Sequence, residues 1–538
     1  MTGSPLVRHN DWDTVDVADP VAFTPTLSVS VVIPARNCSA SLALTLASLT
    51  VQTYPADLLD VVVVDDCSEP PLVLPEIRPS RCRLVRTTPG SRGIAAAVNL
   101  GVTESSGTIV HRLDADMIAH PDHVAMLARW HHAIRYAVTL GSKRFVDVSP
   151  GSPQWPTPAN VADPQTYDGL FDVDESEPHA FVDDLVRRTD QLRSGNHLAF
   201  MATVGATVAV RREMWDAAGG LDAHLRLGED TEFGYRLMQA GAVFIPESRA
   251  RAWHLGHTQM MRQSAALRRY NRPHLADRMP QPRWLRKTGG SAWSVPLAVV
   301  AVEVAEQPLE RVRTAVDAIL RGADRDLRVD LVGPWDRLTV EPRDVLSDPH
   351  LDLRLLAATY DSDPRVRLAA SIPDPFPSPY LIVLPPTVVI ASDAIGRLIG
   401  EADIHQVGRV TVVPTGVELW RTAALGRAKW LSGAEHGERA EQARVAVNVV
   451  ATHGSRTLTA ADVGLLDIAT MPIERLTDGL DGTVDDVRGG RWLPATVEVG
   501  GVRTLALATA VVARSTAKRL LARVGSWSAA WGRRVRRG

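Results

Sequence analysis

Two acidic residues stand two positions apart in Asp114-Ala115-Asp116, just after the apolar run that starts at Thr108. Residues i and i+2 of a strand share one face, so at the end of a strand both carboxylates can point at the same spot. Such a pair suits Mg²⁺ or Mn²⁺, which bind oxygen ligands and share their shell with substrate phosphates. Alone, the pattern fits a solvated acidic loop as well, so its meaning depends on what the rest of the chain supplies.

Two earlier apolar runs, Val29–Ile33 and Val61–Val64, predict buried parallel strands, and a helical pattern of leucines lies between them. Strand, helix and strand of this length form a right-handed βαβ unit, whose ligands lie at the carboxyl ends of the strands. Asn37, Asp65 and Asp66 follow these strands. We therefore expect them at the ligand edge of the sheet.

A Gly-rich turn that includes Gly93 leads into a small-residue helix, 94–101, which contains Asn99. Its spacing is neither that of a P-loop nor that of a dinucleotide fingerprint, so neither ATP nor NAD is indicated. A glycine turn lets the backbone approach a ligand closely, and the helix N-terminus favours an anion. Tight packing between helices explains the small residues equally well.

Glu229 and Asp230 precede an apolar helical pattern over 233–240, which places both acids in the first turn of a predicted helix. The helix dipole stabilises acids there by roughly 0.3–1 kcal/mol each, so a capping role stands beside a catalytic one. His254 and His257 follow a later predicted strand and are candidate metal ligands. Residues 147–197 lose periodicity, which indicates either an acceptor-side loop or disorder.

Taken together, these residues resemble the family-2 nucleotide-sugar glycosyltransferases with the GT-A fold, from about Ser28 to Met261. The pieces occur in the family's order and spacing. The sequences of these pieces are most similar to those of bacterial chondroitin-polymerase-like and galactosyltransferase-like domains. The pieces are 32–37, 63–68, 93–101, 113–118, 228–233 and 254–257.

The resemblance implies a role for each candidate residue. Asp116 and His257 would bind Mn²⁺ or Mg²⁺ on the diphosphate, and Asp230 would be the general base, with inversion at the anomeric carbon. Glu229 would hold an acceptor hydroxyl, although family members differ on which acid does which, and some relatives with this histidine motif retain configuration. Asp66 would hold the base. The nucleotide- and sugar-binding set would be Pro34, Ala35, Arg36, Asn37, Asp65, Asp66, Gly93, Asn99 and Asp114.

An internal duplication is expected, because the pattern begins again at Ser294. Leu327–Gly333 stands where Leu59–Asp65 stood, and Pro385 and Pro386 replace the acids. The expected fold is α/β: a Rossmann-like GT-A domain, then a degenerate GT-A-like α/β domain and a basic C-terminal helix. The predicted divisions are an N-terminal extension (1–27), the catalytic GT-A domain (28–265), a linker (266–293), the degenerate GT-A-like or other α/β domain (294–499) and a basic amphipathic tail (500–538).

Composition is that of a soluble globular protein, with 45% hydrophobic and 22% charged residues. The net charge of −3 argues against a nucleic-acid partner. Three cysteines without metal-site spacing favour a reducing cytosol, and we find neither a signal peptide nor a membrane-spanning run. Residues 503–538 hold nine Arg or Lys and no acid, with Trp and Leu between them, which predicts either contact with an anionic membrane surface or a docked solvated helix.

Together with the resemblance, these patterns predict a cytoplasmic enzyme, either free or peripheral on the inner face of the plasma membrane. It would move a sugar from a nucleoside diphosphate, UDP in the first place, to a glycan or lipid-linked acceptor in cell-wall, polysaccharide or glycoconjugate synthesis. A catalytically inactive glycan- or nucleotide-binding scaffold is the first alternative, and the intact Asp116, Asp230 and His257 speak against it. A nucleotidyltransferase is the second, and it would require a Gly-rich basic loop directly after the first strand.

Overall fold

The computed structural model describes residues 4–88, 90, 93–286, 293–304, 307–339, 342–432 and 438–477. By its internal contacts the chain divides into Met1–Ala469 and Thr470–Gly538, and in the second unit only helix α15 (Glu474–Thr477) is described. The basic tail predicted at 500–538 lies outside the described residues. Within the described part, we find no helix that is long and apolar enough to cross a membrane.

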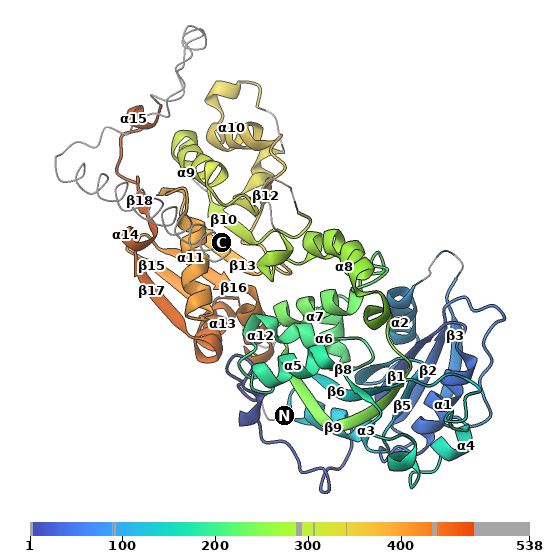
Figure 1. The fold of residues 1–538 in the computed structure, drawn as a ribbon. Helices are drawn as coiled ribbons and strands as arrows, with labels where there is room; N and C mark the ends of the chain where they lie inside the picture. The colour runs from blue at the N-terminus through green and yellow to red at the C-terminus, as the bar shows by residue number, and fades with distance from the viewer. Residues whose placement is uncertain are drawn as a thin grey trace, which may run out of the picture. The chain divides into compact units, whose positions relative to one another are not determined.

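The first half is built on one mixed sheet with the strand order β3-β2-β1-β4-β8-β6-β9-β5, and β7 is paired to β6 (Figure 1). Strands β1, β2, β3 and β4 are parallel to one another, β8 is antiparallel to β4 and β6, and β9 is parallel to β6. The strands are β1 (Val29–Ala35), β2 (Leu59–Asp65), β3 (Cys82–Arg86), β4 (Ile109–Leu113), β5 (Met117–Ala119), β6 (Ala137–Val146), β7 (Glu177–Pro178), β8 (Thr207–Arg211) and β9 (Val243–Leu255).

Helices cover both faces of this sheet. Val31 and Ile33 pack into a core cluster with α1 and α3, whereas Val32 packs into another with α2, α6 and α7. Because successive strand residues face opposite sides, β-branched runs such as 29–33 must be buried on both. The helices are α1 (Ser39–Thr50), α2 (Ile94–Thr103), α3 (His123–Ala133), α4 (Pro158–Val161), α5 (Ala180–Arg188), α6 (Arg212–Ala217), α7 (Glu229–Gln239) and α8 (Gln259–Arg278).

The segment 147–197 is ordered, with short elements separated by turns. Helices α4 and α5 and strand β7 lie within it. Helix α5 buries only Leu185, which explains why its apolar periodicity is hard to read in the sequence. Of the two alternatives for this segment, disorder is therefore wrong.

The second half repeats this topology. Its sheet has the order β12-β11-β10-β13-β16-β15-β17, and each neighbouring pair has the direction of its counterpart in β3-β2-β1-β4-β8-β6-β9. The strands are β10 (Ala298–Glu303), β11 (Leu327–Val332), β12 (Val366–Ala369), β13 (Tyr380–Leu384), β14 (Val388–Ile390), β15 (Arg409–Val413), β16 (Val417–Arg421), β17 (Ser455–Thr459) and β18 (Leu465–Asp467). The helices are α9 (Leu309–Arg321), α10 (Leu351–Tyr360), α11 (Ala394–Ile404), α12 (Thr422–Ser432), α13 (Glu438–His453) and α14 (Ala460–Val463).

The strand pairing shows which residues of the second half correspond to which residues of the first. Val29 pairs with Leu59 in one sheet and Ala298 with Leu327 in the other, so Leu327 takes the place of Leu59, as expected. Three residues separate β13 from β14, as they separate β4 from β5. The acids at 114 and 116 therefore correspond to Pro385 and Thr387. The prediction that two prolines replace the acids is wrong for Pro386. Counted from the end of the preceding strand, Pro386 corresponds to Ala115, and Thr387 corresponds to Asp116.

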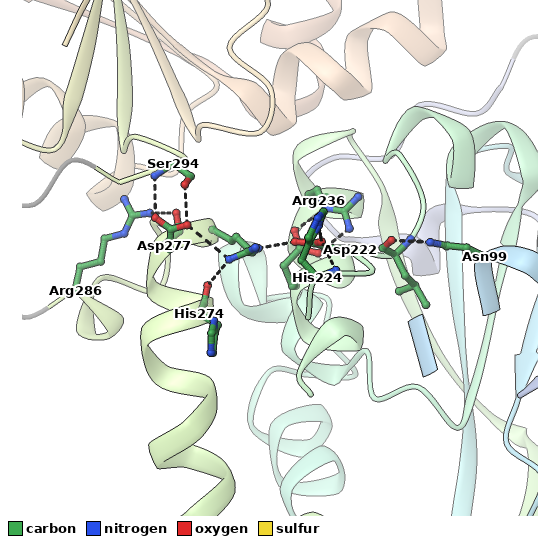
Figure 2. A network of polar contacts seen from close by, with 11 residues as sticks. Asn99, Asp222, His224, Arg236, His274, Asp277, Arg286 and Ser294 are labelled. Atoms are coloured by element: carbon green, nitrogen blue, oxygen red, sulfur yellow. Dashed lines mark hydrogen bonds and ion pairs between the residues drawn. The ribbon is translucent and has the colours of Figure 1, made fainter. Parts of the chain in front are cut away.

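The connection between the halves is partly helical, because α8 continues to Arg278 through the first part of the predicted linker. Arg278 Nε donates to Asp222 Oδ2 over 2.5 Å. Asp277 accepts hydrogen bonds from the N–H and hydroxyl of Ser294 over 2.9 and 2.7 Å (Figure 2). This polar chain ties the loop before α7 to the start of the second half. The domain boundaries themselves stay predictions.

Candidate active site

The acidic pair occupies the turn between β4 and β5. The Asp114 N–H donates to Ala206 O over 3.2 Å, and the Asp116 carbonyl accepts from Leu255 N–H over 2.9 Å, so neighbouring segments hold both ends of the turn. Oδ1 of each acid is buried and has no hydrogen-bond partner among the described residues. A buried carboxylate oxygen without a partner is costly unless a cation or ligand completes it. Each of these oxygens has a basic side chain nearby, with Arg112 Nε 3.5 Å from Asp114 Oδ1 and His254 Nε2 3.7 Å from Asp116 Oδ1. Metal binding at Asp116 stays a prediction.

His254 is the histidine nearest to this pair. Its Nδ1 lies 3.0 Å from the Gly256 carbonyl, and its Nε2 lies 3.7 Å from Asp116 Oδ1. Because a carbonyl oxygen only accepts, Nδ1 must carry the proton in the neutral ring, which leaves the Nε2 lone pair facing Asp116. Burial, and then the charge of Asp114, raise the pKa of Asp116, while His254 opposes them. A cation between Asp116 and His254 would remove this conflict.

His257, the predicted metal ligand, lies at the end of the same segment but faces another acid. Its Nε2 is 3.2 Å from Glu177 Oε1, and its side chain is 28% exposed. Its role at the metal stays a prediction. Within the described residues, no group of three or more His, Cys, Asp or Glu side chains is placed to hold a metal. Mg²⁺ and Mn²⁺ sites do not need such a group, because one or two protein ligands and substrate phosphates suffice.

Glu229 and Asp230 begin α7, after Gly228 at φ +78°. Asp230 is half-buried, and its Oδ1 accepts from the Thr231 N–H over 2.6 Å. Glu229 is 5% exposed, and burial together with the charge of Asp230 raises its pKa to about 7. The two adjacent acids therefore have different surroundings, and Asp230 is the one that a substrate can reach.

Arg112 links the two acidic groups, and sequence reasoning missed it. It lies on β4, with Nε 3.5 Å from Asp114 Oδ1 and NH2 3.3 Å from Glu229 Oε1. A Cβ at Gly205 (φ +48°) would lie 2.7 Å from that NH2 group, so the glycine leaves room for the guanidinium. The available signal is a charged residue inside an otherwise buried strand, which requires a partner.

Asp65 is the last residue of β2 and Asp66 follows it, and the two carboxylates make different contacts. Asp65 is fully buried, and its carboxylate accepts from the N–H groups of Ser68 and Leu72 over 2.8 and 3.1 Å. Burial raises its pKa, but these hydrogen bonds and Arg86 outweigh burial and hold the pKa below its usual value. Asp66 accepts from the Gly93 N–H over 3.0 Å. Asp65 therefore shapes the loop, while Asp66 connects β2 to the start of α2.

The segment after β1 lies at the same edge. Pro34 and Ala35 end the strand, whereas Arg36 and Asn37 are exposed. Asn37, at φ +50°, accepts from the Glu69 N–H through Oδ1 over 2.9 Å, and its own N–H donates to Ser68 Oγ over 2.9 Å. The loops after β1 and β2 are thus fastened to each other. Arg36 lies beside these loops and is exposed, and its role toward a nucleotide stays a prediction.

Gly93 and Asn99 lie at the start and in the middle of α2. Gly93, at φ +115°, is the N-cap and donates to Asp66. Both ends of the Asn99 amide pair with the backbone of Leu221, over 2.8 and 2.9 Å, at one end of the network in Figure 2. Asn99 therefore fixes the loop that leads to Glu229. Its role in nucleotide or sugar binding stays a prediction.

Residues 30–189 match the family model described as "Glycosyl transferase family 2". The chain carries a family-2 glycosyltransferase domain. The match includes Asp114 and Asp116, and it ends before Glu229 and the histidines. Glu229 is nonetheless in contact with Arg112 of β4, and His254 lies beside Asp116. The expected family is confirmed, and so is the expected α/β class with a GT-A-type first sheet.

Two curated relatives share this family-2 region. Chondroitin synthase of Escherichia coli is 27% identical over 237 residues, which are 42% of this chain and 34% of the relative. The pre-mycofactocin glycosyltransferase of Mycobacterium tuberculosis is 28% identical over 237 residues, 43% of each chain. The chain therefore spans less than half the length of either relative.

Solved structures resemble the family-2 half more distantly. The mannosyltransferase PcManGT of Pyrobaculum calidifontis, in complex with GDP-Man and Mn²⁺, is 20% identical, with a TM-score of 0.31 over 52% of this chain and 70% of its own. S. aureus TarS, in complex with UDP-GlcNAc, is 16% identical, with a TM-score of 0.31 over 43% of this chain and 59% of its own. These ligands belong to those proteins.

Proposed function

We propose that the protein is a metal-dependent glycosyltransferase that moves a sugar from a nucleoside-diphosphate sugar to a hydroxyl of a glycan or lipid-linked acceptor. UDP is the first candidate for the nucleotide. The observation that carries the proposal is the acidic turn: Oδ1 of Asp114 and Oδ1 of Asp116 are buried without a hydrogen bond among the described residues, and Arg112 connects Asp114 to Glu229 at the start of α7. A general acidic loop would be solvated. This one is held by backbone hydrogen bonds from both neighbouring segments.

The donor side is formed by the carboxyl ends of β1, β2 and β4. Asp66, with the exposed Arg36 and Asn37, would take the base and ribose, and Asp114 would hold the ribose or sugar. Mn²⁺ or Mg²⁺, held by Asp116 with His254 or His257, would neutralise the charge that develops on the leaving diphosphate. PcManGT was solved with Mn²⁺, which agrees with this choice of ion.

Asp230 is our candidate for the general base. Its carboxylate is half-buried at the N-terminus of α7, where it could take the proton of the acceptor hydroxyl during an inverting attack. Glu229 faces Arg112 and would orient the acceptor rather than take its proton. Asp230 is half-buried, whereas Glu229 is only 5% exposed.

The biological setting is proposed by analogy with the relatives. One of them is named a chondroitin synthase and the other a pre-mycofactocin glycosyltransferase. We propose a role in cell-surface polysaccharide or glycoconjugate synthesis in the cytoplasm, with the basic tail at 500–538 on an anionic membrane. The second half would buttress the first or bind the acceptor, since it has Pro385 and Thr387 where the first half has Asp114 and Asp116.

Calorimetric binding of UDP tests the site. Tight binding in Mn²⁺ that is lost in EDTA and in Asp116→Ala supports the proposal. Asp122→Ala, which removes an exposed acid six positions away, should bind as the wild type does. Asp230→Asn should bind UDP normally but release none from UDP-sugars in the presence of acceptor. Binding that ignores the metal, or none to UDP, GDP or TDP, would remove the acidic-turn assignment.

A further inference from the structure

Lysine is rare in this chain. Of 59 basic residues, only four are lysines, at positions 143, 287, 429 and 518. Lys429 is an ordinary surface residue, 58% exposed and paired with Asp374 over 2.7 Å. Lys143 is 6% exposed on β6, and within the described residues no hydrogen bond or ion pair reaches its amine. Lysine is almost never buried without a partner, so this position needs an explanation.

The amine lies at a cavity of about 80 Å³ between β6 and α5. Val182 and Val186 line much of it with apolar side chains, and His179, Asp183 and Glu247 add titratable groups. Glu247 is already paired with Arg129 over 2.6 Å. A volume of this size holds several waters and therefore one small oxyanion. His179 Nδ1 is buried and has no partner among the described residues, so a second donor or acceptor is unused there.

The cavity lies on the acceptor side of the acidic turn. The nucleotide edge is formed by β1, β2 and β4, whereas β6 lies beyond β8 on the other side of β4. Burial lowers the pKa of Lys143 to about 8, and the charges of Asp114, Asp230 and Asp183 oppose that shift. The amine is therefore mostly charged at neutral pH and lies within the electrostatic field of the proposed base.

Among the described residues, no acid is in direct contact with the Lys143 amine. Asp114 pairs with Arg112, Asp230 is the proposed base, and Asp183 is exposed at the rim of the cavity. Burial, with Lys143 next, lowers the pKa of His179 to about 3, so this ring is neutral and cannot balance another charge. A sugar hydroxyl would give the ammonium a hydrogen bond but no counter-ion in direct contact, whereas an oxyanion supplies both.

We propose that this cavity is an acceptor subsite in which the Lys143 ammonium binds a carboxylate carried by the acceptor sugar. The acceptor is thus an acidic glycan, and Lys143 anchors its charged group while a hydroxyl is presented to Asp230. The inference rests on the proposed function, because it assumes that an acceptor enters beside Asp230. Beyond the proposed function, the inference specifies that the acceptor is negatively charged.

The small number of lysines makes the test direct. Protein grown with lysine labelled with ¹³C at Cε gives one NMR signal per lysine, and Lys143→Met identifies the signal of interest. The sample is titrated with sodium acetate, with acetamide as the neutral isostere and with sodium chloride as the salt control. We expect acetate alone to shift the Lys143 signal saturably and to raise its pKa, with the Lys429 signal unmoved beyond the salt control.

A Lys143 signal that ignores acetate, or that follows acetamide equally, overturns the subsite. So does a shift produced by UDP and Mn²⁺ without acetate, because it would place the donor diphosphate at the lysine. UDP binding is measured on the same sample: if UDP binds and acetate does not, only the subsite fails, whereas loss of UDP binding rejects the proposed function itself. Lys143→Met and the control Lys429→Met should both bind UDP as tightly as the wild type.

Discussion

Arg112 NH2 lies 3.3 Å from Glu229 Oε1, and both side chains are less than a tenth exposed. The contact joins β4, which carries the acidic turn, to the first residue of α7, which carries the proposed base. A guanidinium in a buried site keeps its charge and fixes the direction of its partners. Arg112 therefore links the acidic turn to the helix that carries the proposed base.

Arg112→Gln should lower turnover about 100-fold, the scale expected when reacting groups are displaced by about 1 Å. Arg112→Lys should restore part of the rate, because lysine keeps the positive charge but lacks the planar group that reaches Asp114 and Glu229 together. UDP release from UDP-sugar measures both. The control is Arg187→Gln, since Arg187 is 73% exposed on α5. An unchanged rate with a normal pH profile would show that the contact only supports the fold.

Glu229→Gln should change how stability depends on pH. Burial and the charge of Asp230 raise the Glu229 pKa to about 7, so between the unfolded value near 4.5 and about 7 the folded protein binds a proton that the unfolded chain has released. The stability linked to this proton is complete below pH 4.5 and is lost as pH rises through 7. Glutamine has no such loss. The variant should match the wild type at pH 4.5 and exceed it at pH 8, by about 3 kcal/mol at most.

Thermal unfolding at the two pH values measures this difference. A melting temperature raised equally at both would mean that packing, and not the proton, accounts for the effect.

Asp65→Asn should destabilise the protein and do so mainly above acid pH. The Asp65 carboxylate accepts from two backbone N–H groups and from Arg86, which together hold its pKa below the usual 3.8. Its contribution is therefore present above pH 3.8 and is lost as pH falls through the lowered value. We expect a loss of about 1–3 kcal/mol at pH 7, measured by urea unfolding. A similar loss at pH 3 would contradict the assignment.

The acidic turn could be predicted because a short-range pattern suffices for it. An apolar run followed by Asp114-Ala115-Asp116 sets strand, turn and facing carboxylates together. The repeat of the sheet was also visible, since Leu327 takes the place of Leu59. By contrast, His254 approaches Asp116 because β9 pairs antiparallel with β5 at Met117, and no local pattern encodes that pairing. Arg112 and Lys143 were missed for the same reason: Arg112 pairs with Glu229, and Lys143 lines a cavity with residues of α5, and in both cases the neighbours are distant in sequence.

Gly241→Ala tests the packing between the two halves. A Cβ at Gly241 would lie 2.2 Å from the backbone N of Arg427 in α12, whose side chain also donates to the Ala242 carbonyl over 2.8 Å. Gly241 has φ +93°, so alanine there adds conformational strain to the clash. Gly416 is a matched control, because it has φ +72° and open space around its Cβ.

Gly416→Ala should cost about 1–2 kcal/mol, which is the strain alone. Gly241→Ala should cost more than that, since neither backbone can yield without moving α12 away from the end of α7. Because α7 begins at Glu229 and ends at Gln239, beside this contact, UDP release should fall as well. Thermal unfolding and limited proteolysis of both variants measure the first effect. Equal losses in the two variants would mean that the halves can shift apart freely, and the second half would then have no part in holding the catalytic helix.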